Sequence, residues 1–221
     1  MKVIVKKEIL DKIPSYTVIA YKFSMDIKES DARIKDKVKE EEEKYQFLSL
    51  EELINLDVIK EGRDGYKKFG KDPSRYRLAC ESLLRRLVKK MGLYYINNAV
   101  DIGNILSIET KRPVAVLDFD KVKGDVTFRL GRIDDEYEGI GRGKINVENI
   151  PVYVDDISPF GSPTSDTLRT AITNNTKNIL LFINCFSGRF VKECENMMEE
   201  LYKDLGDVST FEKIDVQYER N

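Results

Sequence analysis

The stretch NILLFINCF, residues 178–186, is the most apolar strand-like segment of the chain. Its branched and aromatic side chains predict a strand that lies in the protein core. Working outward from it, six further segments are rich in β-branched and aromatic residues and predict strands over residues 2–5, 16–23, 113–119, 125–131, 150–156 and 211–217. The strands are spread along the whole chain, which favours mixed sheets over a separate all-β unit.

Helical patterns lie between these strands. Residues 28–46 are dominated by Lys and Glu at i,i+4 spacing, which indicates an exposed helix. Ser49, followed three places later by Glu52, forms a capping-box pattern that starts a short helix. Asp72 is a good N-cap and Pro73 a good first helical residue, so we expect another helix to begin there. Two more helical patterns cover residues 96–110 and 188–206, and a turn-rich connector is expected over residues 62–71.

The order of these elements predicts an α+β fold, with mixed and antiparallel sheets flanked by helices in one domain. A chain of 221 residues, 41% of them hydrophobic, is long and apolar enough to bury a real core. Within this domain we expect residues 1–72 to supply N-terminal strands and the charged helical segment. That part would pack on a core formed by residues 73–221.

The charge balance and the absence of histidine exclude several classes of function. The chain has 37 Lys and Arg against 39 Asp and Glu, a net charge of −2, whereas proteins that coat duplex nucleic acid usually carry a strong basic excess. Any nucleic-acid contact must therefore come from a local patch. With no histidine, Ser–His–Asp and Cys–His catalysis and most His-ligated metal sites are excluded.

The three cysteines, Cys80, Cys185 and Cys194, show no CxxC spacing, which argues against a disulfide framework and a structural zinc site. Cys185 lies in the apolar strand and is expected to be a small core residue. No apolar run approaches the roughly 18 residues of a membrane span, and the first residues are strand-like rather than typical of a signal peptide. We therefore expect a cytoplasmic protein without membrane contact.

The segment GSPTSDTLRTAITNNT, residues 161–176, gathers Ser, Thr, Asp and Asn side chains around a single arginine, Arg169. A turn-rich loop has this composition, and so does the wall of a pocket that binds a small polar ligand. Gly161 allows a close backbone approach at the start of the segment. The residue types alone leave both interpretations open.

Acidic and basic clusters also have two interpretations each. Asp118 and Asp120 would share one face of a strand, and Asp155 and Asp156 would end another. Paired carboxylates either cap turns or bind a metal. Asp101 and Asn104 would share one face of the helix 96–110, where a hydrogen-bonding structural role is expected. The basic cluster Arg85, Arg86, Lys89 and Lys90 either complements a helix dipole or contacts phosphate.

Two segments together resemble a known family. NNAVDIGNILSIETKRPVAVLDFDKVKGDVTFRLG and GSPTSDTLRTAITNNTKNILLF are similar to the B3/B4 editing domain of the phenylalanyl-tRNA synthetase β subunit, which also has free-standing relatives. The resemblance covers roughly residues 73–186. It rests on Val100, Asp101, Asn104, Glu109, Pro113, Asp118, Asp120, Lys121 and Gly124, and then on Thr170, Ile172, Thr176, Asn178, Leu180 and Leu181.

This resemblance implies a barrel-like core and an editing activity: hydrolysis of the ester of mischarged aminoacyl-tRNA, here by a stand-alone protein acting in trans. Water would attack the activated ester, with backbone amides stabilising the oxyanion. No cofactor, no metal and no obligate protein partner is implied. The partner would be the acceptor end of aminoacyl-tRNA.

The chain departs from the family pattern at three positions. Ala115 stands where the family has a histidine, Phe182 where the second motif ends in Glu, and Leu168 near the acidic residue that reads a tyrosine hydroxyl. These departures imply that the pocket reads an amino acid other than tyrosine.

The resemblance gives the following expected roles. The catalytic residues are Asp166, Arg169 and Thr170, and the substrate-binding residues are Gly161, Ser162, Thr164, Ser165, Asn104 and Ala115. Phosphate contacts are expected from Arg75, Arg77, Arg85 and Arg86, with Lys67, Lys68 and Lys71 nearby. Two alternatives remain: a non-catalytic module that binds a tRNA end, a free amino acid or a protein partner, and a metal-dependent enzyme that uses Asp118, Asp120 and Asp155.

Overall fold

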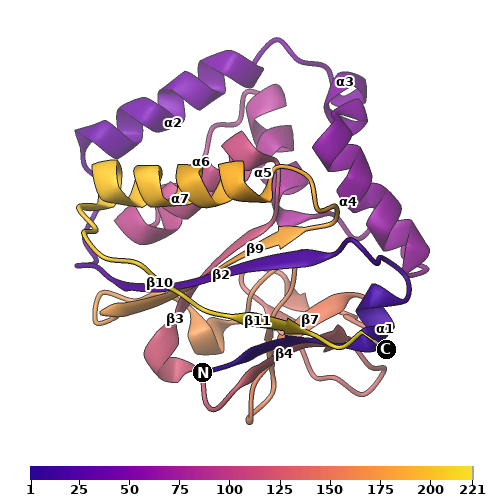
Figure 1. The fold of residues 1–221 in the computed structure, drawn as a ribbon. Helices are drawn as coiled ribbons and strands as arrows, with labels where there is room; N and C mark the ends of the chain where they lie inside the picture. Colours follow the sequence, from indigo (N-terminus) through magenta and orange to yellow (C-terminus); the bar gives the residue numbers. More distant parts are fainter. Residues whose placement is uncertain (221) are drawn as a thin grey trace.

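The computed structural model describes residues 1–220 and has three layers (Figure 1). A layer of helices covers one face of a four-stranded sheet, and a five-stranded sheet covers the other face. The predicted α+β class is confirmed. Both sheets are open, with edge strands at each side, so the closed barrel-like core that we expected does not form within residues 1–220.

The apolar strand β9 (Asn178–Cys185) is an inner strand of the four-stranded sheet. It pairs antiparallel with β2 along its full length and with β3 on its other side. Because helices cover one face and the second sheet the other, seven of its eight residues are buried. The order of this sheet is β10 (Glu212–Lys213), β2 (Thr17–Ser24), β9 and β3 (Val114–Asp118).

The five-stranded sheet is mixed. Strand β1 runs parallel to both of its neighbours, whereas β7 runs antiparallel to both β4 and β8. Its order is β11 (Val216–Tyr218), β1 (Val3–Val5), β4 (Val126–Leu130), β7 (Pro151–Val154) and β8 (Pro159–Gly161). A separate small hairpin consists of β5 (Glu138–Gly139) and β6 (Gly143–Lys144).

The helices surround this pair of sheets. They are α1 (Lys7–Leu10), α2 (Ala32–Tyr45), α3 (Leu50–Asn55), α4 (Asp57–Lys68), α5 (Ala79–Val88), α6 (Asn98–Thr110) and α7 (Val191–Gly206), with short 3₁₀ helices η1 (Phe119–Lys121) and η2 (Leu168–Thr170). The capping box of Ser49 and Glu52 forms as predicted at the start of α3. Within residues 1–220, no helix is both long enough and apolar enough to span a membrane.

Two hydrophobic clusters follow from the layering. One lies between the two sheets and extends to α4 and α5, and it includes Phe128, Tyr153 and Phe182. The other lies between the four-stranded sheet and helices α2, α6 and α7. Alternate residues of β3 point into different clusters: Ala115 belongs to the first, and Val116 packs against the second.

The prediction that a helix begins at Asp72 is wrong, because α5 begins at Ala79. Asp72 caps an isolated turn instead: its side chain accepts the N–H of Ser74 at 2.8 Å, and its carbonyl accepts the N–H of Tyr76 at 2.9 Å. The backbone then becomes extended at Leu78 before the helix starts. A good N-cap sequence therefore marks a turn here rather than a helix terminus.

The predicted connector over residues 62–71 is also wrong for most of its length, because α4 continues to Lys68. Its two glycines are buried on the face that packs against the core. A Cβ at Gly62 would lie 2.3 Å from Leu78, and one at Gly65 would lie 2.3 Å from Phe186. These glycines allow α4 to approach its neighbours closely and do not mark a turn.

Candidate functional site

The polar segment Gly161–Thr170 follows directly from β8 and ends in η2. The carbonyl of Pro163 accepts the N–H of Ala79 at 2.8 Å, which joins the segment to the start of α5. The β5–β6 hairpin lies against it, since the N–H of Ile140 donates to the carbonyl of Asp166 at 2.9 Å. The segment is therefore held between the five-stranded sheet, α5 and a hairpin.

Ser162 organises the tight turn at the start of this segment. Its hydroxyl donates to the carbonyl of Ser165 at 2.9 Å and accepts the N–H groups of Thr164 and Ser165 at 3.3 and 3.2 Å. The small side chain thus replaces backbone partners within the turn. The backbone amides of Thr164 and Ser165 are occupied by this contact.

Asp166 is the most unusual residue of the segment. The residue keeps some exposure, but its Oδ1 atom is buried and has no hydrogen-bond partner within residues 1–220. Burial raises the pKa of Asp166 to about 7. A Cβ at Gly161 would lie 2.8 Å from this oxygen and 2.4 Å from the ring of Tyr153, so only glycine leaves room for both side chains.

Buried tyrosines contribute hydroxyl groups to the same region. The hydroxyl groups of Tyr66 and Thr164 are hydrogen-bonded at 2.8 Å, and Tyr137 donates to the carbonyl of Ser165. The hydroxyl of Tyr153, which is fully buried, accepts a hydrogen bond from Nδ2 of Asn184 at 2.6 Å.

The sequence analysis missed these tyrosines. They belong to α4, the loop before β5, and β7, which are far apart in the chain. Three successive residues of β7, including Tyr153, are buried, so alternation along this strand does not single out Tyr153. Tyr66 was missed because its part of the chain was predicted to be a connector, whereas it lies in α4.

Arg169 has a different environment. Its guanidinium forms a two-fold hydrogen-bonded ion pair with Asp155, at 3.1 and 2.8 Å, and also donates to the carbonyls of Lys121 and Ser158. Burial opposes the ionisation of Asp155, but Arg169 and backbone N–H groups outweigh it and lower the pKa of this carboxyl. Thr170 is fully buried and donates to the carbonyl of Phe160 at 3.4 Å.

Asn104 and Ala115 occupy two different layers. Asn104 belongs to α6 in the helical layer, whereas Ala115 faces the core between the sheets. Ala115 lies directly opposite Phe182 in the β3–β9 pair. The ring of Phe182 packs on Phe128 and Tyr153, with centroids 5.1 and 5.4 Å apart. Two of the three positions that depart from the family pattern are therefore neighbours in an apolar part of the core.

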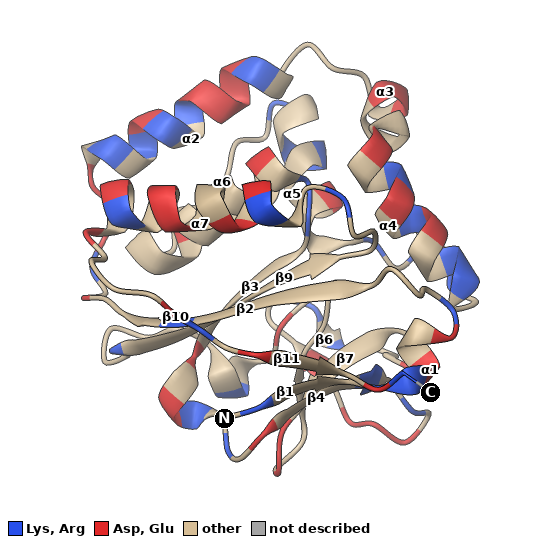
Figure 2. Ribbon diagram, in the orientation of Figure 1, with Lys and Arg blue, Asp and Glu red and all other residues tan. Residues whose placement is uncertain are grey.

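The predicted phosphate contacts fall into two groups. Arg75 and Arg77 are exposed in the loop before α5 and take no part in the ion pairs among residues 1–220. Arg85 donates to the buried carboxylate of Glu81 at 3.1 Å, and Arg86 donates to the carbonyl of Gly92 at 2.9 Å. Figure 2 shows Lys and Arg at the end of α4, next to this loop. The exposed loop is the better candidate for contact with phosphate.

The acidic pairs have structural partners. Strand β3 ends at Asp118, so the prediction that Asp118 and Asp120 share one face of a strand is wrong. Asp118 caps η1 and accepts the hydroxyl of Thr176 at 2.7 Å, and Asp120 accepts the Nδ2 group of Asn178. No group of three or more His, Cys, Asp or Glu side chains within residues 1–220 is arranged to hold a metal ion.

Asp101 has structural partners too. Its carboxylate is buried and accepts the hydroxyl of Ser30 at 2.6 Å and the N–H of Ile96 at 3.0 Å. Burial raises its pKa. It therefore ties the loop before α2 to the start of α6, as a hydrogen-bonding structural residue does.

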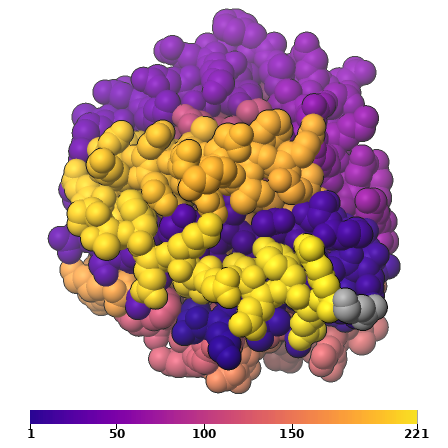
Figure 3. Space-filling model, in the orientation of Figure 1, coloured from indigo at the N-terminus to yellow at the C-terminus, as the bar shows by residue number. Residues whose placement is uncertain are grey.

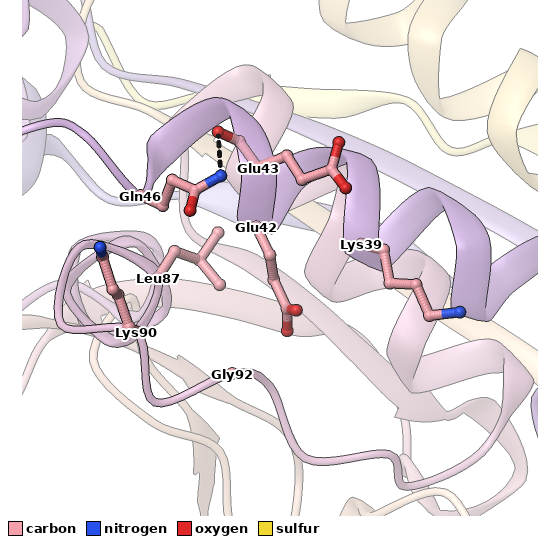
Figure 4. Close-up of a pocket in the computed structure, with 7 residues that line it drawn as sticks. All are labelled: Lys39, Glu42, Glu43, Gln46, Leu87, Lys90 and Gly92. Atoms are coloured by element: carbon pink, nitrogen blue, oxygen red, sulfur yellow. Dashed lines mark hydrogen bonds between the residues drawn. The ribbon is translucent and has the colours of Figure 1, made fainter.

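A separate cleft lies between α2 and the end of α5 (Figure 4). It has a volume of about 240 Å³, and its lining includes charged side chains of α2 and Lys90, which follows α5. The carboxylate of Glu42 accepts the N–H of Leu93 at 3.2 Å across this cleft. None of the predicted catalytic or substrate-binding residues lines it.

Comparison with known proteins identifies relatives of the chain. Residues 62–199 match the model of the B3/4 domain. The phenylalanine–tRNA ligase β subunit of Fusobacterium nucleatum is 31% identical over 151 residues, which cover 66% of this chain and 18% of that protein. The corresponding subunit of Cupriavidus pinatubonensis is 32% identical over 109 residues, 48% of this chain and 13% of that protein. The chain thus spans less than a fifth of the length of these relatives.

A solved structure shares the fold. It is an N-terminal fragment of the phenylalanyl-tRNA synthetase β subunit from Pyrococcus horikoshii, with a TM-score of 0.54 and 13% sequence identity. The superposition covers 99% of this chain and 52% of that fragment. The similarity therefore extends over the whole described chain, including the strands and helices before residue 62.

Proposed function

The chain belongs to the B3/4 domain family, and we propose that it hydrolyses the ester bond of mischarged aminoacyl-tRNA in the cytoplasm, acting in trans. The family relationship to phenylalanine–tRNA ligase β subunits supports a tRNA-related role. The observation that carries the proposal is the Oδ1 atom of Asp166, which is buried and has no hydrogen-bond partner within residues 1–220, in a segment rich in Ser and Thr hydroxyl groups. A polar group in this state needs a ligand to complete its hydrogen bonds.

The proposed reaction uses Asp166 as a general base. A carboxyl group with a pKa of about 7 can take a proton from water near neutral pH. The hydroxide equivalent attacks the ester carbonyl, and the bond to the ribose oxygen breaks. Asp166 gives its proton to this oxygen, so that the free amino acid and tRNA leave and the carboxylate is restored.

Other residues of the segment are proposed to shape the pocket. Gly161 leaves space beside Asp166, and Ser162 fixes the turn that carries Thr164 and Ser165. Because Arg169 is already paired with Asp155, we propose that it holds the segment in place and does not contact the reacting ester. Thr170 supports the same turn through Phe160.

The acceptor end is proposed to approach along the loop that carries Arg75 and Arg77. This loop leads to Ala79, whose N–H is bonded to Pro163 of the polar segment. Phosphate groups bound by the two arginines would therefore lie near the pocket wall. A local basic loop is compatible with the net charge of −2.

The test is a deacylation assay against a panel of tRNAs, each charged with a correct or an incorrect amino acid. We expect release of one mismatched amino acid, and a rate reduced at least about 100-fold in Asp166→Asn, as for loss of a general base. Asp134→Asn, which removes an exposed carboxylate, is the matched control and should keep full activity. Equal rates in the wild type and Asp166→Asn would contradict the assignment.

One observation favours a second function, a binding module without catalysis. Ala115 and Phe182 form an apolar cross-strand pair where the family pattern has polar residues. Without these polar groups, the domain could bind its ligand without promoting hydrolysis. Thermal stabilisation by a free amino acid, with no deacylation of any charged tRNA in the panel, would favour the binding module.

A further inference from the structure

A buried arginine on the opposite side of the four-stranded sheet has an unusual partner. Arg112 follows α6 and is 2% exposed. Its Nη2 group donates to the carbonyl of Arg189 at 2.7 Å, and its Nε group lies 3.3 Å from the Sγ atom of Cys194. None of the ion pairs among residues 1–220 includes Arg112.

A buried guanidinium requires a negative counter-charge, because an isolated charge is costly in the protein interior. Here the side-chain acceptor at its Nε group is a cysteine sulfur, so ionisation of this thiol would supply the missing charge. Cys194 also lies in the first turn of α7, where the helix dipole favours a negative group. Both features favour the thiolate form of Cys194.

A second cysteine lies beside this one. Cys185 is the last residue of β9, and both cysteines belong to the same buried cluster. A hydrogen bond from Cys185, together with the positive charge of Arg112, lowers the pKa of Cys194, while the same hydrogen bond and burial raise the pKa of Cys185. Ionisation is therefore favoured for the Cys194 thiol, whereas the Cys185 thiol stays protonated.

A groove lies next to this pair of buried thiols, and neighbours of both cysteines line it. It has a volume of about 370 Å³ and lies between the start of α7, strand β2 and the C-terminal segment. Val191 and Glu195, which flank Cys194 on α7, line it, as does Thr17, the cross-strand partner of Cys185. Figure 3 shows this face, with strand β2 (indigo) visible between α7 and the C-terminal segment. A molecule as small as a peroxide fits this groove.

We propose that Cys194 is a redox-active thiolate stabilised by Arg112, and that it forms a reversible disulfide with Cys185 when hydrogen peroxide enters the groove. The Cys194 sulfur attacks one peroxide oxygen, the O–O bond breaks, and hydroxide leaves and is protonated by solvent. This step oxidises the sulfur to a sulfenic acid and reduces the peroxide. The Cys185 sulfur then attacks the sulfenic sulfur, the S–S bond forms, and the S–O bond breaks with loss of water.

The test is peptide mapping of the folded chain after brief exposure to hydrogen peroxide, before and after reduction with dithiothreitol. We expect one disulfide, between Cys185 and Cys194, that dithiothreitol removes. Cys80 is the internal control, because it is buried, its pKa is raised by burial, and it should stay a free thiol. Three free thiols after treatment, or oxidation of Cys80 at the same rate as the other two, would overturn the proposal.

Substitutions assign the order of the two steps. In Cys185→Ser the reaction should stop at a sulfenic acid on Cys194, which a cyclic 1,3-diketone traps as an adduct. In Cys80→Ser the disulfide should form as in the wild type. At neutral pH, Cys194 should also react with iodoacetamide about tenfold faster than Cys80 in the wild-type chain, which requires no substitution. Failure to find the adduct, or equal alkylation of the two thiols, would contradict the assigned roles.

Discussion

Asp155 and Asp166 lie eleven positions apart, yet the fold treats their carboxyl groups in opposite ways. Asp155 accepts two hydrogen bonds from Arg169 and three from backbone N–H groups, and its pKa is lowered. Asp166 has a buried oxygen without a partner, and its pKa is raised to about 7. A fully paired carboxylate stabilises a structure, whereas an unpaired one in a polar pocket is available for binding or proton transfer. The comparison therefore separates a structural aspartate from a candidate functional one.

The largest effect is expected when the structural aspartate, Asp155, loses its partner. In Arg169→Ala, Asp155 remains buried without its counter-charge, so we expect the free energy of unfolding to fall by about 3–5 kcal/mol. Urea unfolding followed by circular dichroism measures this change. Arg33→Ala, which removes a cation exposed beside Asp31 and Asp207, is the control and should change the stability much less, because solvent screens exposed ion pairs. Equal losses in both variants would show that Asp155 does not depend on Arg169.

The raised pKa of Asp166 can be tested through the pH dependence of stability. The folded-state pKa of Asp166, about 7, is higher than its ordinary value of 3.8, so the folded chain holds the proton more tightly than the unfolded chain. Stability should therefore decline as pH rises from about 4 to about 7, by up to about 4 kcal/mol. Asp166→Asn should remove most of this decline, and Asp134→Asn should leave it unchanged.

For Asp155 we expect the opposite change of stability with pH. Its lowered pKa contributes stability above the ordinary aspartate value, and that contribution is lost as pH falls through the folded pKa. If the free energy of unfolding depended on pH in the same way for Asp166→Asn and the wild type from pH 4 to 7, the raised pKa of Asp166 would be refuted.

Local patterns predicted the parts of the fold that depend on local interactions. The strand at residues 178–186 and the capping box of Ser49 and Glu52 carry their signals within a few residues, and both form. The α4 helix was missed because Gly62 and Gly65 are explained only by their contacts with Leu78 and Phe186. A glycine that marks a turn and one that allows close packing look the same in a single sequence.

The candidate site shows the same limit. The Ser- and Thr-rich segment was identifiable from composition, but its tyrosines come from distant elements. The pairing of Arg169 with Asp155 depends on how β7 and η2 pack, and no spacing in the sequence indicates it. Asp166 was selected with Arg169 as one catalytic pair, whereas the structure gives the two side chains different environments.

A smaller effect is expected when the space beside Asp166 is filled. Gly161→Ala places a methyl group 2.4 Å from the ring of Tyr153 and 2.8 Å from Oδ1 of Asp166, so one of them must move. We expect a loss of about 1–3 kcal/mol in the free energy of unfolding, as for overpacking of a core. Gly188→Ala is the matched control, since its Cβ would meet no atom within 4 Å. Equal stability of both variants would mean that the space beside Asp166 adapts freely.

The smallest effect concerns the exposed loop, where neither aspartate takes part. In Arg75→Ala/Arg77→Ala, we expect tRNA affinity to fall about tenfold and the dependence on salt concentration to weaken by about two contacts, because two phosphate partners are lost. The folded state should keep its stability, since both side chains are exposed. Filter binding at several salt concentrations measures both quantities, and Lys2→Ala/Lys203→Ala removes two exposed cations elsewhere as the control. An equal loss in both double variants would indicate a general charge effect, whereas a selective loss would place the phosphates beside the pocket that contains Asp166.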